Sequence, residues 1–355
     1  MARLEGNTAP EPMTAHSPAR PLALTMGDPA GIGLQLALKA WAQRDARGLA
    51  PFVIFADRDA LEGTARRLDL DVLVKAVDTP AEAGEVFAKA LPVIPIALAT
   101  PAEPGIADAR NAAATLGSID AAANAVMSGT ARALVTNPIA KSVLYQAGFA
   151  HPGHTEYLGA LAARYYPGET YNPVMLLASD ELRVVPLTVH IPLAAVPAAI
   201  TAALIESTVL TLAQSLSRDF GVPSGRIAIA GLNPHAGEDG SIGREDIDII
   251  APAIARLKAR GVAVTGPHSA DTLFHAAARQ TYDAVVAMYH DQALIPIKTL
   301  AFDRGVNVTL GLPFVRTSPD HGTAFGIARA GTANPESLIQ ALLLADRMAT
   351  RRALA

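Results

Sequence analysis

Short apolar segments alternate with segments of helical pattern along most of this sequence. The apolar segments are rich in Val, Ile and Leu, which is typical of strands buried on both faces of a sheet. Strands that are separated by helices along the chain usually pair in parallel. The alternation therefore predicts an α/β fold with a largely parallel sheet. The segments that we expect to form strands are 21–26, 51–56, 133–136, 174–178, 182–189, 226–230, 283–288 and 306–310.

The length of 355 residues is enough for two lobes with a large shared core. No long linker interrupts the alternation, so we expect the second lobe to be inserted in the first. We place the first lobe at residues 21–135 together with 283–355, and the second at 136–282. Residues 1–20 are polar and rich in Pro and Ala, and we expect them to form a disordered tail.

The composition excludes several classes of protein and of site. The chain has no cysteine, so any metal would be held by His, Asp or Glu. Its net charge of −4 offers no basic surface for nucleic acid. The longest apolar stretch, residues 193–205, contains Pro197 and Thr201 and is shorter than the roughly 20 residues of a membrane span. We expect this stretch to be a buried helix, and the protein to be cytoplasmic, without membrane or nucleic-acid partners.

The segment from Gly27 to Gly33 joins the first predicted strand to a helix, as a dinucleotide-binding turn would. However, Leu36 stands where the third glycine or alanine of the Rossmann fingerprint belongs, and Asp28 and Pro29 lie inside the turn. A strand-to-helix turn that needs positive φ explains the glycines equally well. We therefore reject a Rossmann site here and assign no cofactor-binding residues.

Polar residues follow several of the predicted strands, and they include His190, His235 and His290. Ligands of open α/β sheets bind at the carboxyl ends of strands, so this recurrence predicts an active site. Each histidine alone could simply cap or hydrogen-bond a loop. Three of them would instead suit a divalent metal with open coordination positions. Their wide spacing matches no known metal motif, so the residues alone leave both interpretations open.

Cationic side chains occur in apolar, Gly- and Pro-rich surroundings, where a solvated charged face is not expected. Lys298, Arg304 and Arg316 are the examples, and arginine suits bidentate recognition of phosphate or carboxylate. His154 and Thr155 precede a helical stretch, whose N-terminus favours an anion. An ordinary threonine cap is the alternative for that segment. A small substrate with one phosphate and one carboxylate would use all of these groups.

Taken together, the motifs closely resemble those of the 4-hydroxythreonine-4-phosphate dehydrogenase family of vitamin B6 biosynthesis. The resemblance runs from about residue 21 to the C-terminus. After Gly33 this chain has Leu34 and Gln35, where the family usually has proline and a polar or acidic residue. The matching motifs are 25–33 (TMGDPAGIG), 153–156 (GHTE), 231–238 (GLNPHAGE), 270–274 (ADTLF), 288–292 (MYHDQ) and 311–318 (GLPFVRTS).

The resemblance implies a two-lobed fold like that of isocitrate and isopropylmalate dehydrogenases, with a central cleft and a non-Rossmann dinucleotide site. It also implies a homodimer with shared active sites and an interface on the second lobe. His190, His235 and His290 match the metal ligands, the third supplied by the partner chain. The positions that match substrate-binding residues are His154, Thr155, Asp271, Lys298, Asn307 and Arg316, and those near the reacting atoms are Asp291 and Lys298.

The activity that the resemblance implies is the NAD- or NADP-dependent oxidation of 4-phosphooxy-L-threonine. The product, 2-amino-3-oxo-4-phosphooxybutanoate, would lose carbon dioxide to give 3-amino-2-oxopropyl phosphate. One divalent metal per site is expected, with zinc, magnesium, cobalt and manganese all open. Relatives of similar sequence oxidise other phosphorylated hydroxy acids, such as D-threonate or D-erythronate 4-phosphate. A metal-dependent hydrolase or acyltransferase on the same scaffold is a further alternative.

Overall fold

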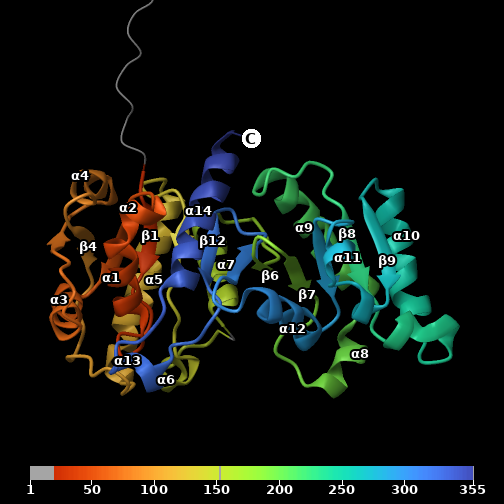
Figure 1. Cartoon of the computed structure of the whole chain (residues 1–355), viewed down its shortest axis with the longest axis horizontal. Helices are drawn as coiled ribbons and strands as arrows, with labels where there is room; N and C mark the ends of the chain where they lie inside the picture. The colour runs from red at the N-terminus through yellow and green to blue at the C-terminus, as the bar shows by residue number, and fades with distance from the viewer. Residues whose placement is uncertain (1–19, 152, 355) are drawn as a thin grey trace, which may run out of the picture.

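The computed structural model of the protein describes residues 20–151 and 153–354. The tail expected at residues 1–20 lies outside this range except for Arg20, which donates a hydrogen bond to the carbonyl of Gly129 at 2.8 Å. Within the described residues, the strands form one 12-stranded sheet (Figure 1). In sheet order they are β3 (Val74–Ala76), β4 (Leu91–Pro95), β2 (Phe52–Ala56), β1 (Leu22–Thr25), β5 (Leu134–Val135), β12 (Arg316–Pro319), β11 (Val306–Leu310), β6 (Val174–Ala178), β7 (Arg183–Pro186), β10 (Ala284–Ala287), β8 (Ile227–Ala230) and β9 (Val264–His268).

The sheet consists of two parallel halves joined by antiparallel strands. β3, β4, β2, β1, β5 and β12 pair in parallel, and so do β7, β10, β8 and β9. Between them, β11 and β6 pair antiparallel with their neighbours. The predicted α/β class is confirmed. The division into two lobes stays a proposal; within the sheet, β10 lies between β7 and β8, and the chain returns to the first half at β11.

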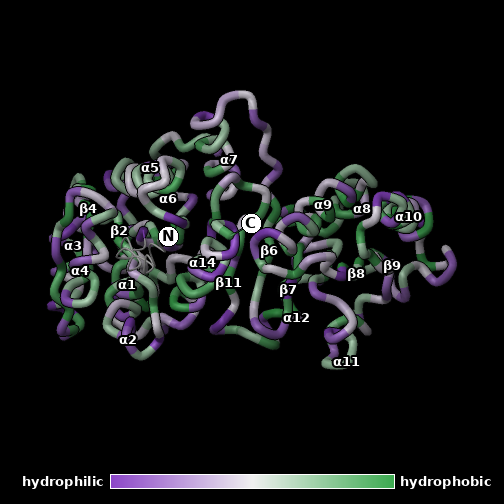
Figure 2. The backbone as a smooth tube through the Cα atoms, turned by 90° about the horizontal axis from the view of Figure 1, so that it is seen from above, coloured by the Kyte–Doolittle hydropathy of each residue, from purple (hydrophilic) through white to green (hydrophobic). Residues whose placement is uncertain are grey.

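Helices cover both faces of this sheet, as Figure 2 shows from above for α1 on one side and α5 on the other. Alternate residues of the central strands point to the two faces: Leu22 and Leu24 pack with α1, and Ala23 packs with α5. The helices are α1 (Gly33–Ala42), α2 (Arg44–Arg47), α3 (Arg58–Arg67), α4 (Ala83–Val86), α5 (Ala112–Met127), α6 (Lys141–Gln146), α7 (His154–Tyr165), α8 (Val196–Ala199), α9 (Ala202–Arg218), α10 (Ala251–Ala259), α11 (Ala276–Arg279), α12 (His290–Ala301), α13 (Phe325–Ala328) and α14 (Glu336–Leu354).

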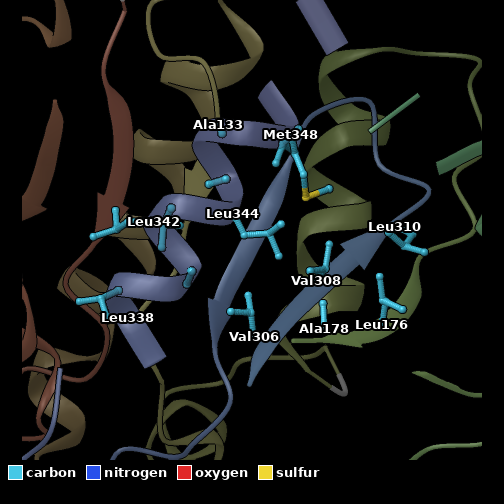
Figure 3. Close-up of a cluster of buried hydrophobic side chains, with 14 of the residues drawn as sticks. Ala133, Leu176, Ala178, Val306, Val308, Leu310, Leu338, Leu342, Leu344 and Met348 are labelled. Atoms are coloured by element: carbon cyan, nitrogen blue, oxygen red, sulfur yellow. The ribbon is translucent and has the colours of Figure 1, made fainter. Parts of the chain in front are cut away.

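The core continues across the junction between the two halves, where α14 covers β11 and β12. Leu344 and Met348 of α14 point toward Val306 and Val308 of β11, whereas Leu338 and Leu342 point away from β11 (Figure 3), and all six are buried. Burying such side chains stabilises a fold by about 1.5–3 kcal/mol each. The packing fixes β11, and with it the side chains that β11 and β12 turn toward the site.

The apolar stretch at 193–205 does not form the single helix that we expected. Its helices α8 and α9 are bent by 89° at a break, where Thr201 caps α9 by accepting a hydrogen bond from the backbone N–H of Leu204 at 3.2 Å. A capping threonine satisfies a free N–H at a helix start and so favours a new helix there. In the part of the chain that the structure describes, no single helix is long and apolar enough to cross a membrane.

The glycine turn after β1 is a packing element. Gly27 has φ +73°, and a Cβ there would lie 2.6 Å from the carbonyl oxygen of Pro138. A Cβ on Gly33 would lie 2.3 Å from the carbonyl oxygen of Met26. The glycines therefore let the turn approach its own backbone and the loop after β5. This explains their presence without a dinucleotide.

Candidate functional site

A cleft of 660 Å³ lies where β5, β7 and β10 end. Thr136 directly follows β5, His190 comes shortly after β7, and His290 begins α12 after β10; all three line the cleft. Their places after separate strands led us to expect such a meeting. The cleft also brings together five residues predicted to bind substrate: His154, Thr155, Lys298, Asn307 and Arg316.

Arg316, at the start of β12, is the most unusual group of the cleft. Its residue is 4% exposed, and its guanidinium donates hydrogen bonds only to two threonine hydroxyls, those of Thr136 at 2.6 and 3.1 Å and Thr309 at 2.9 Å. No carboxylate pairs with it among the described residues. Burial lowers its pKa to about 10, which still leaves it cationic at neutral pH. A buried charge without a counter-ion is costly, so this position is suited to an anion from outside the chain.

The first turn of α7 lies against this charge. His154 has a buried Nε2 atom with no hydrogen-bond partner among the described residues. Burial lowers the pKa of His154 well below its ordinary value, and the charges of Arg316 and Lys141 add to the effect. The imidazole is therefore neutral and can donate or accept one hydrogen bond toward a ligand. Thr155 follows it in the first turn, where free backbone N–H groups favour anions.

Gly153 precedes this helix because there is no room for a side chain. A Cβ at Gly153 would lie 2.8 Å from Oε2 of Glu156 and 3.2 Å from Nζ of Lys141. Both of these charged residues line the cleft. The glycine thus lets a lysine and a glutamate approach the start of α7 at the cleft wall.

Lys298 and Asn307 form another part of the wall. The ammonium of Lys298 lies 2.6 Å from the carboxylate of Asp320 and donates a hydrogen bond to the carbonyl oxygen of Asp320 at 2.6 Å. Asn307 of β11 has a buried Oδ1 atom with no partner in the described chain. An unsatisfied buried amide oxygen at a cleft wall is available to a donor on a ligand.

His190 and His290 face each other in the cleft, with ring centroids 5.7 Å apart. Burial lowers the pKa of His190, and the charges of Lys141 and His290 contribute in the same direction. Asp291 lies outside the cleft lining, with a side chain 71% exposed, and contacts Nδ1 of His290 at 2.7 Å. A carboxylate on one ring nitrogen fixes the tautomer and leaves the other nitrogen free for a metal. Asp291 is therefore placed to orient His290 rather than to touch a substrate in the cleft of its own chain.

His235 lies outside this cleft. It is exposed and borders a separate depression with Glu238 and Asp239. Asp271 is exposed as well; a hydrogen bond from Ser269 lowers its pKa, and the nearby charge of His235 adds to the shift. Within the described residues, no group of three His, Asp or Glu side chains could hold a metal. One chain thus brings together His190 and His290 of the three predicted histidines. His235 lies apart from them.

The turn that carries His235 has a rare backbone conformation. Positive φ values of 41–83° occur at five consecutive residues, which are His235, Ala236, Gly237, Glu238 and Asp239. Each residue with a Cβ is strained in this left-handed region. Such strain persists only where surrounding contacts hold the backbone, and it concentrates at functional sites.

Asp246 holds the start of this turn. It is 1% exposed, and its carboxylate accepts hydrogen bonds from the backbone N–H of Leu232 at 2.8 Å and of Asn233 at 3.1 Å. The side-chain amide of Asn233 donates a further bond to it at 2.9 Å and one to Glu245 at 2.8 Å. Hydrogen bonds to a buried carboxylate are stronger than those between neutral groups. Asp246 therefore fixes the backbone immediately before His235.

Several cleft residues were absent from the sequence-based set. Thr136 and Asp320 contact Arg316 and Lys298 directly, and Lys141 and His321 also line the cleft. Thr136 is one of the polar residues that follow predicted strands, and Asp320 and His321 come shortly after the predicted residue Arg316, so the sequence indicated the position of these three. Lys141 had none, because it begins a short helix of ordinary pattern.

Comparisons with known proteins identify the family of this chain. The family described as pyridoxal phosphate biosynthetic protein PdxA matches residues 48–345. The chain belongs to this family. A relative from Methylorubrum populi, named 4-hydroxythreonine-4-phosphate dehydrogenase, is 57% identical over 336 residues, which are 94% of this chain and 96% of that protein. The predicted family is therefore confirmed, and with it an oxidoreductase activity.

Two solved structures extend the comparison. The crystal structure of 4-hydroxythreonine-4-phosphate dehydrogenase from Klebsiella pneumoniae has a TM-score of 0.82 and 39% identity, and the match covers 94% of this chain and 99% of that one. A terephthalate 1,2-cis-dihydrodiol dehydrogenase from Burkholderia xenovorans has a TM-score of 0.60 and 29% identity, covering 92% and 98%. Both neighbours are named dehydrogenases, and the substrate in the first name carries a phosphate.

Proposed function

We propose that this PdxA-family dehydrogenase oxidises 4-phosphooxy-L-threonine with NAD or NADP and the help of one divalent metal. The product, 2-amino-3-oxo-4-phosphooxybutanoate, is a β-keto acid and loses carbon dioxide to give 3-amino-2-oxopropyl phosphate. We also propose that the enzyme acts in the cytoplasm as a homodimer. The names of the relatives support the reaction, and the cleft supports the substrate class.

The observation that carries the proposal is the buried guanidinium of Arg316, which lines the cleft and has no carboxylate partner in residues 20–151 and 153–354. A substrate phosphate would supply the missing negative charge. The hydroxyl of Thr136 holds the guanidinium in place, and the neutral ring of His154 and the start of α7 offer further donors. Together these groups can bind a dianion, and the ammonium of Lys141 beside the start of α7 adds a positive charge.

The proposal of a divalent metal rests on the side chains that could bind it. His190 and His290 are candidate imidazole ligands that face each other, and Asp291 contacts Nδ1 of His290. Two histidines leave room for a third ligand, which we assign to His235 of a second copy. Such an ion, when bound, stabilises negative charge on the substrate oxygen that loses its proton.

The remaining side chains orient the substrate and handle its protons. Lys298 and the buried oxygen of Asn307 lie on the same wall and would contact the carboxylate, hydroxyl and amino groups of the substrate. Holding the substrate at both its phosphate and its carboxylate end fixes the carbon that gives up hydride. The nicotinamide supplies the hydride acceptor. Lys298 is the candidate for taking the hydroxyl proton, provided that its ion pair with Asp320 opens.

Exposed apolar residues next to the histidines support a second copy at this place. Ile191 is 40% exposed and Leu193 is 69% exposed on the segment after His190, and Ile295 is 64% exposed on the helix that begins at His290. Large apolar residues that cluster on a surface are typical of protein interfaces. A partner covering them would bring its own surface to the edge of the cleft. We propose that it contributes His235 and Asp271.

The test is a substrate panel followed by NADH absorbance, with 4-phosphooxy-L-threonine, D-threonate 4-phosphate, D-erythronate 4-phosphate and an unphosphorylated cis-diol. We expect turnover of 4-phosphooxy-L-threonine and loss of activity after chelation that zinc, magnesium, cobalt or manganese restores. Turnover of another phosphorylated hydroxy acid alone would correct the substrate but keep the reaction class. Activity without NAD or NADP would favour the hydrolase or acyltransferase alternative and refute the proposal.

A further inference from the structure

A second cavity lies away from the candidate site, where the C-terminal half of α14 meets the β6–β7 hairpin and the end of α9. Its volume is 210 Å³, and it shares no lining residue with the cleft. In Figure 1 this end of α14, marked C, lies at the top of the view, whereas α12 lies at the bottom. We call it the arginine cavity because Arg183, Arg304, Arg347 and Arg351 line it.

Most of the acids around the arginine cavity already pair with arginines. The carboxylate of Asp219 is 1% exposed and accepts two hydrogen bonds from Arg218 and two from Arg352, at 2.8–3.1 Å. Glu181 pairs with Arg304 at 2.6 Å. Asp180 is the one other acid that lines the cavity. The four lining arginines thus meet two lining carboxylates, Asp180 and Asp219, and the adjacent Glu181, in a chain whose net charge is −4.

Arg183 is the most constrained of these cations. It donates a hydrogen bond to the carbonyl oxygen of Asp283 at 3.2 Å, and its guanidinium lies 5.1 Å from the ring centroid of Phe220. The carboxylate of Asp283 is itself bound to Arg226. Burial lowers the pKa of Arg183; the carboxylates of Asp283 and Asp180 raise it, and the charge of Arg347 lowers it. Arg183 therefore lies partly desolvated beside a second positive charge.

Arg347 and Arg351 stand one turn apart on the exposed side of α14. Neither makes a hydrogen bond or an ion pair with any residue in the described part of the chain. Like charges at this spacing on a helix destabilise it, in contrast to the acid–base pairs found on stable helix surfaces. Their side chains nevertheless converge on the same cavity as Arg183. An anion in the cavity would relieve this repulsion.

We propose that the arginine cavity binds a small phosphate-type dianion, either inorganic phosphate or the phosphate of a small phosphomonoester. The planar fork of arginine matches phosphate oxygens and forms bidentate hydrogen bonds with them. The volume accepts a phosphate with a short organic tail, and it lies below the range of pockets for larger ligands. A bound dianion would link α14 to β7 across the junction of the two sheet halves. This site is independent of the substrate phosphate proposed at Arg316.

The test is calorimetric titration of the full-length protein with inorganic phosphate, at constant ionic strength set with chloride. We expect Arg347→Glu to remove one phosphate site per chain or to raise its Kd at least tenfold. Arg183→Gln should act in the same direction. The control is Arg66→Glu, which makes the same charge change on a helix whose arginine is 73% exposed and distant from the cavity. Equal phosphate binding in Arg347→Glu and Arg66→Glu would overturn the proposal.

A second pair of measurements separates this site from the cleft and identifies the source of the dianion. The phosphate site lost in Arg347→Glu should persist in Arg316→Gln, so failure of the proposed enzymatic function would leave the inference intact. Loss of the same site in Arg316→Gln would refute it. Titration with glycerol 3-phosphate tests the second source: tighter binding than inorganic phosphate indicates a phosphomonoester, and weaker binding indicates free phosphate.

Discussion

Replacing Asp246 with Asn tests whether this buried carboxylate holds the left-handed turn that carries His235. The asparagine keeps the size and one oxygen of the aspartate. Its NH₂ group must face either the N–H of Leu232 or the donors of Asn233, so at least one of the three hydrogen bonds is lost. A hydrogen bond to a charged group contributes about 1.5–3 kcal/mol, and a buried N–H left without a partner adds to the loss. We expect local stability to fall by about 3 kcal/mol.

The strain of the turn determines where this loss appears. Four residues with a Cβ have positive φ here, and each costs roughly 1–2 kcal/mol relative to ordinary backbone. Weakening Asp246 should therefore release the turn locally before the rest of the chain unfolds. The assay is hydrogen–deuterium exchange of a peptide spanning residues 231–240. A loss of about 3 kcal/mol predicts roughly 100-fold faster exchange of the Leu232 and Asn233 amides, if these exchange by local opening.

The matched control is Glu245→Gln, at the neighbouring residue. Glu245 accepts one hydrogen bond, from the side-chain amide of Asn233, and the glutamine oxygen can still accept it. Exchange at Leu232 and Asn233 should then change little. Equal exchange rates in Asp246→Asn and Glu245→Gln would refute the assigned role of Asp246. An even acceleration over the whole chain would also refute it, because the effect would then be global.

Three further changes follow from contacts of single residues. Arg316→Met should raise the KM for the phosphorylated substrate but change the melting temperature little, because the buried charge has no carboxylate partner among the described residues. Steady-state kinetics and thermal unfolding measure the two effects, and an unchanged KM would contradict the prediction. Hydrogen bonds from Arg47 lower the pKa of Glu336 to about 2. The ion pair of Glu336 therefore stabilises the folded state above the unfolded-state pKa of about 4.3, and this stabilisation is lost as pH falls toward 2. Glu336→Gln should make the free energy of unfolding depend less on pH between about 4.3 and about 2. Gly27→Ala should destabilise the fold by at least about 2 kcal/mol, because the Cβ would meet the carbonyl oxygen of Pro138 and the φ of residue 27 is positive. Urea unfolding measures this loss of stability. A smaller loss would mean that the loop after β5 moves aside.

Much of the fold was predictable because the periodicity of apolar residues is a local property of the sequence. The strands at 51–56, 174–178 and 306–310 were found at nearly their observed bounds, since runs of apolar residues leave little choice. The order of strands was less accessible. Nothing local to residues 284–287 says that they pair with β7 and β8, because such pairing depends on packing between distant helices. The lobe bounds proposed from the sequence could therefore take no account of this pairing.

The candidate site was also predictable only in part. Polar residues after β5, β7 and β10 could be expected to meet, and Arg316 was identifiable as a cation in apolar surroundings. The direction of a loop was not predictable. His235 follows β8 by only a few residues, yet a left-handed turn carries it out of the cleft. Its deviation depends on Asp246, eleven positions later in the sequence, whose role appears only in three dimensions.

The separation of His235 from the cleft makes mixtures of inactive chains informative. If the proposed dimer forms, a His190→Ala chain and a His235→Ala chain each give an inactive homodimer. Their mixed dimer contains one undamaged centre, built from the His190 of one chain and the His235 of the other. Random reassembly of equal amounts should thus restore about a quarter of the centres, as expected for two-fold symmetric pairing. Two mutations that each abolish turnover would complement each other.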